Sequence, residues 1–387
     1  MFLKGILIEV RSAAVSNAKP VSCFRRKFAV SSIICDGNGQ KYHDRMSDST
    51  RKLVDDFRGS DQQKRFALSK AITLVESNLE KHQEQANLLL QHLMQRSGGQ
   101  RKEFFRLGIA GPPGAGKSTL IEAFGTKLLN EAEISKLAVV CVDPSSTFSG
   151  GSILGDKTRM MDLSTHPQAY IRPSANGGTF GGLSAYTDDV VSLCQAAKYD
   201  FVIVESVGLG QSEIELSKSV DMMVLVLPPA GGDELQGVKK GIVEVAEAIV
   251  INKADGDLQA AARQTASDYK AATRYGSYHR HPNWSTPPVI LVSAHAKTGL
   301  DKLWGKIQEY WKTMEESGDL IRKRQDQAHY WTWKNLNRLF IQHMHCHAKE
   351  TADDMNQKLD SGQITPRAAA KRLMESILES MGDDQKR

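Results

Sequence analysis

Residues 111–119 of the chain read Gly111-Pro112-Pro113-Gly114-Ala115-Gly116-Lys117-Ser118-Thr119, and this stretch decides the fold. An apolar run precedes it at residues 104–110, and a helical pattern follows it at residues 120–124. A strand, a glycine-rich loop and a helix in this order form a phosphate-binding P-loop. The glycines let backbone N–H groups point at phosphate oxygens, and the helix N-terminus adds a positive dipole end. We therefore expect Lys117 to reach the β- and γ-phosphates of a nucleoside triphosphate, and the Ser118 hydroxyl to ligate Mg²⁺.

A second motif indicates which base the nucleotide carries. The apolar residues 248–251 run directly into Asn252-Lys253-Ala254-Asp255, which resembles the base-recognition motif of GTPases. The Asp255 carboxylate can accept two hydrogen bonds from guanine, whereas adenine offers neither donor, and a site built on such a pairing rejects the wrong base strongly. Asn252 would brace this loop and the Lys253 stem would lie along the base. After the apolar residues 289–292, Ser293 and Ala294 stand where GTPases contact the guanine O6 through the backbone. The sequence predicts GTP and GDP as ligands.

Two acidic residues at strand ends are the candidates for holding Mg²⁺ beside Ser118. Asp143 follows the apolar residues 137–142, and Glu205 ends the apolar residues 201–205. Carboxylates of this kind suit Mg²⁺. Glu205 also begins a variant of the Asp-x-x-Gly switch, in which the Gly208 N–H would sense the γ-phosphate. Many GTPases place a water-orienting Gln directly after that glycine, but this chain has Leu209, so we expect slow hydrolysis that a partner accelerates.

Two further loops carry unusual numbers of glycines and charges. In residues 150–160, Asp156 could position water or metal, and Lys157 or Arg159 could offset transition-state charge. With Lys117, Glu205 and Gly208, Asp156 and Arg159 complete the expected catalytic set. Residues 228–241 suit a reversible interface, because their glycines permit motion. The candidate partner-switch residues in this second loop are Gly231, Gly232, Asp233, Glu234, Gln236, Lys239 and Lys240. A plain solvated loop remains the alternative for each.

The pattern between residues 99 and 312 predicts an α/β domain. Near-continuous apolar runs alternate there with segments of helix length, as in a mostly parallel sheet covered by helices on both faces. The expected strands are residues 106–110, 137–142, 170–172, 201–205, 222–227, 248–251 and 289–292.

The flanking regions divide into three segments. Residues 1–47 form the first, and in its first 35 residues six basic side chains face one acid among many serines; this is typical of a mitochondrial transit peptide, with a disordered basic tail as the alternative. Residues 48–98 show helical periodicity through Phe66, Ala67, Ala71, Leu74, Val75 and Leu79. Residues 313–387 carry an apolar helical stripe suited to dimerisation or to an intramolecular cap on the sheet. The stripe comprises Trp331, Trp333, Leu336, Leu339 and Phe340, and Thr365 with Pro366 begins a later helix.

The composition of the chain bears on two classes of partner, nucleic acids and membranes. The 387 residues are 40% hydrophobic and 25% charged, and the net charge of +5 does not by itself indicate nucleic acid. No apolar run approaches the ~20 residues that span a bilayer. The five cysteines are scattered, which favours a reducing compartment and no structural zinc. We therefore expect neither a nucleic acid nor a membrane as partner.

Several longer motifs together resemble one protein family. The P-loop, Val142-Asp143-Pro144-Ser145-Ser146, residues 155–160, residues 205–213 and residues 228–241 are similar to those of the methylmalonic aciduria type A proteins, which are G-protein chaperones of adenosylcobalamin-dependent methylmalonyl-CoA mutase. The similarity extends from about residue 50 to the carboxyl end. It implies a homodimeric GTPase of the signal-recognition/Min type, located in the mitochondrial matrix, that gates cofactor loading onto the mutase and protects or reactivates it. It further implies that residues 231–241 act as a switch toward the mutase, that the Asp156 loop takes part in hydrolysis, and that a cobalamin-delivery enzyme is a candidate partner. Ser206 replaces the threonine that relatives commonly carry.

Two other functions remain open at this point. The segment His343-Met344-His345-Cys346-His347 concentrates metal-capable side chains, and related GTPases deliver nickel to metalloenzymes, so a metallochaperone is one alternative. A P-loop phosphotransferase is the other, although the sequence shows no acceptor base beyond the switch acids.

Overall fold

A computed structural model describes residues 40–77, 79–96, 104–143, 160–175, 186–206, 211–229, 240–275, 282–347 and 349–383. The chain divides into two units, residues 1–41 and 42–387. Within the first unit only Gln40 and Lys41 are described, and they begin helix α2 (Gln40–Arg45). The second unit holds the sheet and all remaining described helices.

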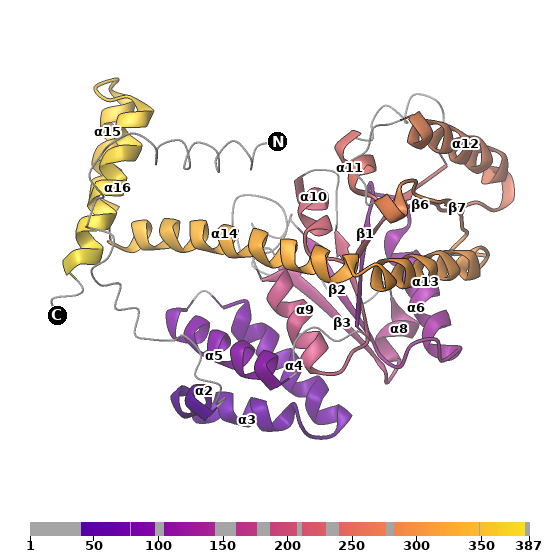
Figure 1. The fold of residues 1–387 in the computed structure, drawn as a ribbon, viewed down its shortest axis with the longest axis horizontal. Coiled ribbons are helices and arrows are strands. Elements are labelled where there is room, and N and C mark those ends of the chain that lie inside the picture. The colour runs from indigo at the N-terminus through magenta and orange to yellow at the C-terminus, as the bar shows by residue number, and fades with distance from the viewer. Residues whose placement is uncertain are drawn as a thin grey trace. The chain divides into compact units, whose positions relative to one another are not determined.

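Seven parallel strands form the sheet at the centre of this unit (Figure 1), in the order β3-β2-β4-β1-β5-β6-β7. The strands are β1 (Phe105–Ala110), β2 (Leu137–Asp143), β3 (Ala169–Ala175), β4 (Phe201–Ser206), β5 (Met222–Leu227), β6 (Ala248–Ile251) and β7 (Val289–Leu291). Every expected strand is present, and the expected bounds of β5 and β6 are those observed. The predicted α/β fold with a parallel sheet is confirmed.

Helices cover both faces of the sheet and enclose two hydrophobic cores. Adjacent strand residues point into different cores, as Val139 and Val140 of β2 and Ile203 and Val204 of β4 do. This double burial explains why the strands are continuous apolar runs. The helices and short 3-10 turns of the domain are α6 (Lys117–Asn130), α8 (Met161–Thr165), α9 (Thr187–Ala196), α10 (Gln211–Ser217), α11 (Lys240–Val245), η4 (Gly256–Leu258), α12 (Gln259–Tyr275), η5 (Pro282–Trp284) and α13 (Leu300–Glu316).

Three N-terminal helices, α3 (Asp48–Asp56), α4 (Asp61–Val75) and α5 (Glu80–Arg96), pack against one another and extend one core, and α4 and α5 also pack against α9. Helix α4 begins at a capping box formed by Ser60 and Gln63. The Arg65 Nη1 atom donates to the Ala169 carbonyl at 2.5 Å, and Arg172 of β3 pairs with Glu76. These contacts protect β3, which is one of the two edge strands of the sheet and would otherwise leave backbone groups unpaired.

Two residues expected in the N-terminal helical core are exposed instead. The buried face of α4 consists of Ala67, Leu68, Ala71, Ile72 and Val75, and Phe66 lies outside that face. The Lys70 ammonium lies over the Phe66 ring, 4.3 Å from its centroid. Leu79 precedes α5 and is also exposed. Periodicity counted both residues as apolar, but burial depends on which neighbour each one meets.

The C-terminal segment consists of α14 (Asp319–His347), α15 (Lys349–Asp360) and α16 (Pro366–Asp383). Thr365 caps α16 as expected, because its Oγ1 atom accepts a hydrogen bond from the Ala368 amide at 3.3 Å. The expected apolar stripe of α14 is divided between two faces. Trp331 is 3% exposed, whereas Trp333 is 67% exposed. Side chains two positions apart in a helix point in directions that differ by about 200° around its axis, so these two tryptophans lie on nearly opposite faces of α14.

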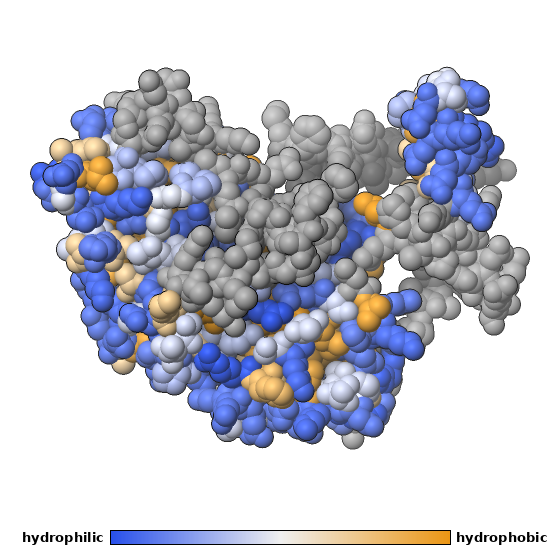
Figure 2. All heavy atoms as spheres, turned by 180° about the vertical axis from the view of Figure 1, so that it is seen from behind, coloured by the Kyte–Doolittle hydropathy of each residue, from blue (hydrophilic) through white to orange (hydrophobic). Residues whose placement is uncertain are grey.

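Hydrophilic residues cover most of the described surface on the face shown in Figure 2, and apolar residues form only small groups there. Among the residues that the structure describes, no helix is both long enough and apolar enough to cross a membrane.

Candidate functional site

The predicted nucleotide-binding segments meet at the carboxyl ends of the parallel strands, which are called the carboxyl edge of the sheet below. All strands are parallel, so the segments after β1, β4, β6 and β7 leave from the same side. In such sheets ligands bind outside the carboxyl ends of the strands. β1, which leads into the P-loop, lies between β4 and β5 at the centre of this edge.

The P-loop depends on glycine at two positions for steric reasons. A Cβ atom on Gly111 would lie 2.0 Å from the Val226 carbonyl oxygen of β5. Gly116 has φ +82° and caps α6, and a Cβ there would lie 2.6 Å from Asn252 Nδ2. At the corresponding position on Gly114, no atom of a more distant described residue lies within 4 Å, so the described part of the structure leaves the loop open at that point. The loop thus fits tightly against the sheet and leaves room on its outer side for a phosphate group.

Lys117 is buried at the first position of α6, and among the residues that the structure describes its hydrogen bonds go to backbone carbonyls and not to a carboxylate. Its Nζ atom donates to the carbonyl oxygens of Gly111 at 2.9 Å and Pro112 at 3.2 Å. Burial lowers the pKa of Lys117, and the charges of Glu205 and Glu213 act in the opposite direction. A buried ammonium that is hydrogen-bonded to neutral carbonyls can bind an anion, such as a phosphate group, at this position.

Ser118 and Glu205 form the oxygen pair expected for a metal. The Ser118 hydroxyl donates to Glu205 Oε1 at 3.0 Å, and Glu205 is buried at the end of β4. A hydroxyl and a carboxylate side by side are hard oxygen donors, which Mg²⁺ prefers. This donor set therefore fits Mg²⁺ bound next to a triphosphate held by the P-loop.

Asn252 connects three segments of the site. Its Nδ2 atom donates to the carbonyls of Ala115 at 2.9 Å and Gly116 at 3.2 Å. Its Oδ1 atom accepts a hydrogen bond from the Ala294 amide at 3.1 Å. Asn252 is buried, and it fixes the phosphate-binding and base-binding segments relative to each other.

The remaining base-site residues lie around this bridge. Lys253 has a left-handed backbone with φ 57°, and its Cε atom is 3.8 Å from the position that a Gly116 Cβ would take. Asp255 is half-buried, and its side chain does not cap the 3-10 turn that follows. Ser293 is buried, and its Oγ atom accepts a hydrogen bond from the Ala296 amide at 3.0 Å. The Lys253 side chain therefore lies beside the P-loop, and Asp255 follows two residues later on the same segment.

Several expected site residues fall outside the described part of the structure. They are Asp156, Lys157, Arg159, Gly208, Leu209, Gly231, Gly232, Asp233, Glu234, Gln236 and Lys239. Asp143 and Lys240 are described only as backbone, at the end of β2 and the start of α11. The side chains of residues 342–349 also lie outside, including those of the His343–His347 segment. Among the residues that are described, no group of three or more His, Cys, Asp or Glu side chains could hold a metal ion.

The structure adds two residues that sequence analysis did not place in the site. Glu213, the last residue of the quoted 205–213 motif, is fully buried in α10, and its charge acts on Lys117. Cys141 is buried in β2, where it pairs with Glu205 across the strands, and its Sγ atom donates to Glu205 Oε2 at 3.7 Å. The motif itself pointed to Glu213, whereas only the strand register places Cys141 beside Glu205.

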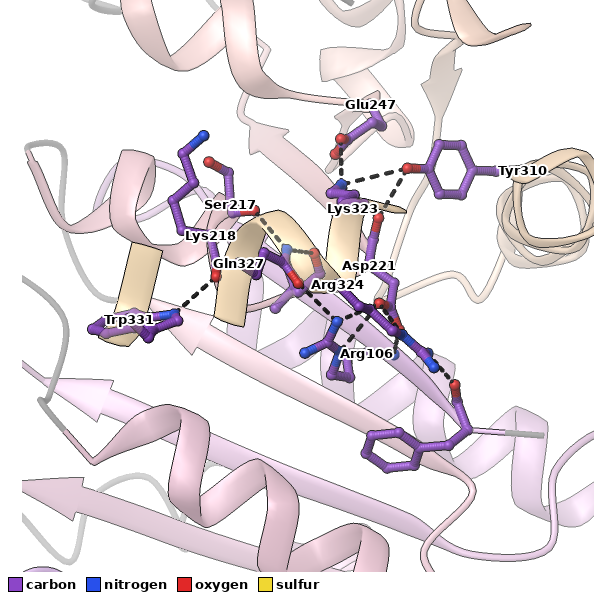
Figure 3. A network of polar contacts seen from close by, with 12 residues as sticks. Arg106, Ser217, Lys218, Asp221, Glu247, Tyr310, Lys323, Arg324, Gln327 and Trp331 are labelled. Atoms are coloured by element: carbon purple, nitrogen blue, oxygen red, sulfur yellow. Dashed lines mark hydrogen bonds and ion pairs between the residues drawn. The ribbon is translucent and has the colours of Figure 1, made fainter. Parts of the chain in front are cut away.

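A second cluster of buried charges lies at the amino ends of the strands, called the amino edge below (Figure 3). Asp221, just before β5, contacts Arg106 of β1 at 2.6 Å and Arg324 of α14 at 2.7 Å. The Arg106 amide also donates to Asp221 at 2.9 Å, and Arg324 donates to the Phe104 carbonyl at 2.6 Å. This cluster joins β1, β5 and α14, and it lies at the amino ends of the strands, away from the P-loop.

Comparisons with known proteins agree with this site. The model of the family described as "Methylmalonyl Co-A mutase-associated GTPase MeaB" matches residues 68–349. The mouse protein named methylmalonic aciduria type A homolog, mitochondrial, is 41% identical over 92% of this chain and 85% of its own length. The Escherichia coli GTPase ArgK is 40% identical over 84% of this chain and 96% of its own.

Among solved structures, one titled as an LAO/AO transport system kinase is similar with a TM-score of 0.65 and 32% identity, covering 86% of this chain and 99% of that one. The fold, the P-loop and the oxygen donors fit a protein that binds GTP and GDP with Mg²⁺ and hydrolyses GTP. The chain therefore belongs to the family of methylmalonyl-CoA mutase-associated GTPases.

Proposed function

We propose that this GTPase is a chaperone that gates adenosylcobalamin loading onto methylmalonyl-CoA mutase and protects or reactivates that enzyme. The observation that carries the proposal is the family match, which spans residues 68–349 and so includes the whole described nucleotide edge. The similarity to a relative named for methylmalonic aciduria, over 92% of this chain, supports the same client.

In this proposal the described residues bind and orient GTP. The Lys117 ammonium exchanges the carbonyls of Gly111 and Pro112 for the β- and γ-phosphates. Ser118 and Glu205, with Asp143, hold the Mg²⁺, which neutralises charge on the phosphates. Asp255 accepts the two guanine hydrogen bonds that adenine lacks.

The remaining residues of the site are assigned from the sequence. The further catalytic roles belong to Asp156, Arg159 and Gly208, and slow hydrolysis follows from Leu209 standing in place of the usual glutamine. Residues 231–241 act as the switch toward the mutase. The guanine O6 would share the Ala294 amide with Asn252, since that amide already donates to Asn252 Oδ1.

The protein acts as a homodimer in this proposal. Trp333, Leu336 and Leu339 are exposed on α14, and a second copy of the chain would bury them. Sedimentation of Leu339→Ser tests this, because loss of one apolar contact should shift the protein toward a mass of one chain. A mass unchanged from that of the wild type would place the dimer contact elsewhere.

The mitochondrial matrix is the proposed location. The relatives from mouse and Caenorhabditis elegans are named mitochondrial, and the basic, serine-rich start of the chain suits import. A fusion of residues 1–47 to a fluorescent protein tests this, and a diffuse cytosolic signal would contradict it.

The test of the chaperone function measures GTP turnover of the full chain alone and with purified methylmalonyl-CoA mutase. We expect slow turnover that rises at least tenfold with the mutase and no comparable turnover of ATP. In a parallel assay, adenosylcobalamin transfer to the cofactor-free mutase should differ between GDP and a non-hydrolysable GTP analogue. A second adenosylcobalamin enzyme serves as the control client.

The two alternatives predict different results in the same experiment. Stimulation by a nickel enzyme and not by the mutase would support a metallochaperone. Transfer of labelled γ-phosphate to a protein or metabolite, rather than release as phosphate, would support a phosphotransferase. Turnover unaffected by the mutase would overturn the proposed client while leaving the GTPase intact.

A further inference from the structure

Helix α10 lies between the nucleotide site and two other parts of the molecule. It follows β4, which carries Glu205, and its consecutive side chains face different neighbours. Glu213 is fully buried, and its charge acts on Lys117 of the P-loop. Ile214 Cδ1 lies 3.7 Å from the position that a Cβ on Gly241 of α11 would take. Glu215 pairs with Lys334 of α14, with 2.5 Å between Oε1 and Nζ.

The segment after α10 is also bound by α14, as Figure 3 shows. Gln327 Nε2 donates to the carbonyls of Ser217 at 3.2 Å and Val220 at 2.8 Å. Trp331 Nε1 donates to the Lys218 carbonyl at 2.8 Å. The Lys334 ammonium lies over the Trp331 ring, 4.9 Å from its centroid. Backbone and side chains of residues 215–220 therefore hold more than two turns of α14.

About one turn before Gln327, Arg324 fixes α14 to the amino ends of β1 and β5, which lie away from the nucleotide site. Arg324 binds Asp221 and the Phe104 carbonyl, and Arg106 Nη2 donates to Gln327 Oε1 at 2.8 Å. The start of α14 is thus anchored to β1 and β5, whereas Trp331 and Lys334 rest on α10 and the turn after it. A shift of α10 would move the second part of α14 relative to the first.

We propose that α10 transmits the state of the nucleotide to α14, with the Glu215–Lys334 ion pair as the contact that carries the change. α10 follows β4, whose Glu205 accepts a hydrogen bond from Ser118 of the P-loop, and Leu216 of α10 packs on β1, with its Cγ atom 3.1 Å from the position that a Cβ on Gly108 would take. A triphosphate held by Lys117 adds negative charge on the side of the P-loop on which the Glu213 charge acts, and the resulting repulsion acts on α10. Because Glu213 and Glu215 belong to the same turn of α10, a displacement that relieves the first moves the second. The inference requires only GTP binding and is independent of which enzyme is the client.

Hydrogen–deuterium exchange of the full chain tests the coupling. Amides of residues 328–341 are compared with GDP and with guanosine 5′-(β,γ-imido)triphosphate bound. We expect protection in the wild type to differ about fivefold or more between the two nucleotides, the low end of typical couplings. In Lys334→Gln the difference should fall below about twofold. Coupling is reciprocal, so the ratio of the two nucleotide affinities should change by a comparable factor.

Two further variants separate the specific contact from general damage. Lys358→Gln removes an ion pair of similar length, to Asp354 in α15 at 2.7 Å, and should leave the difference in protection intact. The exchanged pair Glu215→Lys with Lys334→Glu should restore the difference that Lys334→Gln loses. The proposal is overturned if wild-type protection is equal with both nucleotides, if Lys334→Gln retains the full difference, or if the folded exchanged pair fails to restore it.

Discussion

The carboxyl and amino ends of the parallel strands, called the carboxyl edge and the amino edge here, each bury a charged side chain, but in different ways. At the carboxyl edge Lys117 donates to two neutral carbonyls, and burial lowers its pKa. At the amino edge burial alone would raise the pKa of Asp221, but the Arg106 and Arg324 guanidiniums outweigh burial and hold that pKa far below its ordinary value. A buried charge that is matched by opposite charges holds the fold together. A buried charge that rests on neutral partners indicates where a charged ligand binds.

The largest effect should come from unbalancing the amino edge. Asp221→Asn leaves the Arg106 and Arg324 charges buried without a counter-charge, and losing one partner of a buried pair costs about 3–5 kcal/mol. We expect the midpoint of thermal unfolding to fall by roughly 10 °C. GTP turnover well below that temperature should stay within about twofold of the wild type, because the site lies at the other edge.

The pH dependence of stability supplies the control for this variant. Since the pKa of Asp221 is lower in the fold than in the unfolded chain, its contribution is fully present above pH of about 4 and is lost as pH falls further. The advantage of the wild type over Asp221→Asn should therefore shrink in acid. Asp301→Asn, which removes an exposed ion pair with Lys127, should leave the midpoint nearly unchanged. An advantage constant from pH 7 to pH 2 would contradict this account of the cluster.

The next effect concerns the carboxyl edge and should have the opposite character. Lys117→Met removes a buried charge whose hydrogen bonds go to neutral carbonyls and on which Glu205 and Glu213 act only through their charge, so the unfolding midpoint should stay near that of the wild type. GTP turnover should fall by at least about 10²–10³-fold, since a preorganised cation aimed at the phosphates is lost. Lys127→Met on the same helix is the matched control, and its turnover should stay near that of the wild type. A marked loss of stability in Lys117→Met would show that the two edges do not differ as argued.

The smallest effect should come from changing the base-binding carboxylate. Asp255→Asn loses charge-assisted hydrogen bonds worth about 1.5–3 kcal/mol, so GTP affinity should fall by roughly 10–150-fold. Xanthosine triphosphate should now compete with GTP, because the Asn amide can donate to its 2-carbonyl. Equilibrium binding of both nucleotides measures this, with Asp257→Asn, an exposed neighbour in the next turn, as the control. Unchanged preference for GTP would move the base site away from Asp255.

Contiguous parts of the sequence predicted the fold and the central parts of the site. Strands buried on both faces are continuous apolar runs, so β5 and β6 could be bounded to the residue. The P-loop is a single stretch whose geometry depends on its own glycines, and its lysine lies where the motif predicts, at the first position of α6. Asn252 also lies where its motif predicts, directly after β6, and braces the P-loop as expected although β5 separates β6 from β1 in the sheet.

Only the tertiary structure decided which distant residues meet. Arg106 and Asp221 are 115 positions apart, and their contact depends on β1 and β5 being adjacent in the sheet. Helical periodicity placed Trp331 and Trp333 in one stripe, but packing against residues 217–221 buries only the first. The cause is physical: a local pattern specifies which side chains avoid water, while the order of the strands determines which neighbour covers them and whether a buried charge finds its opposite.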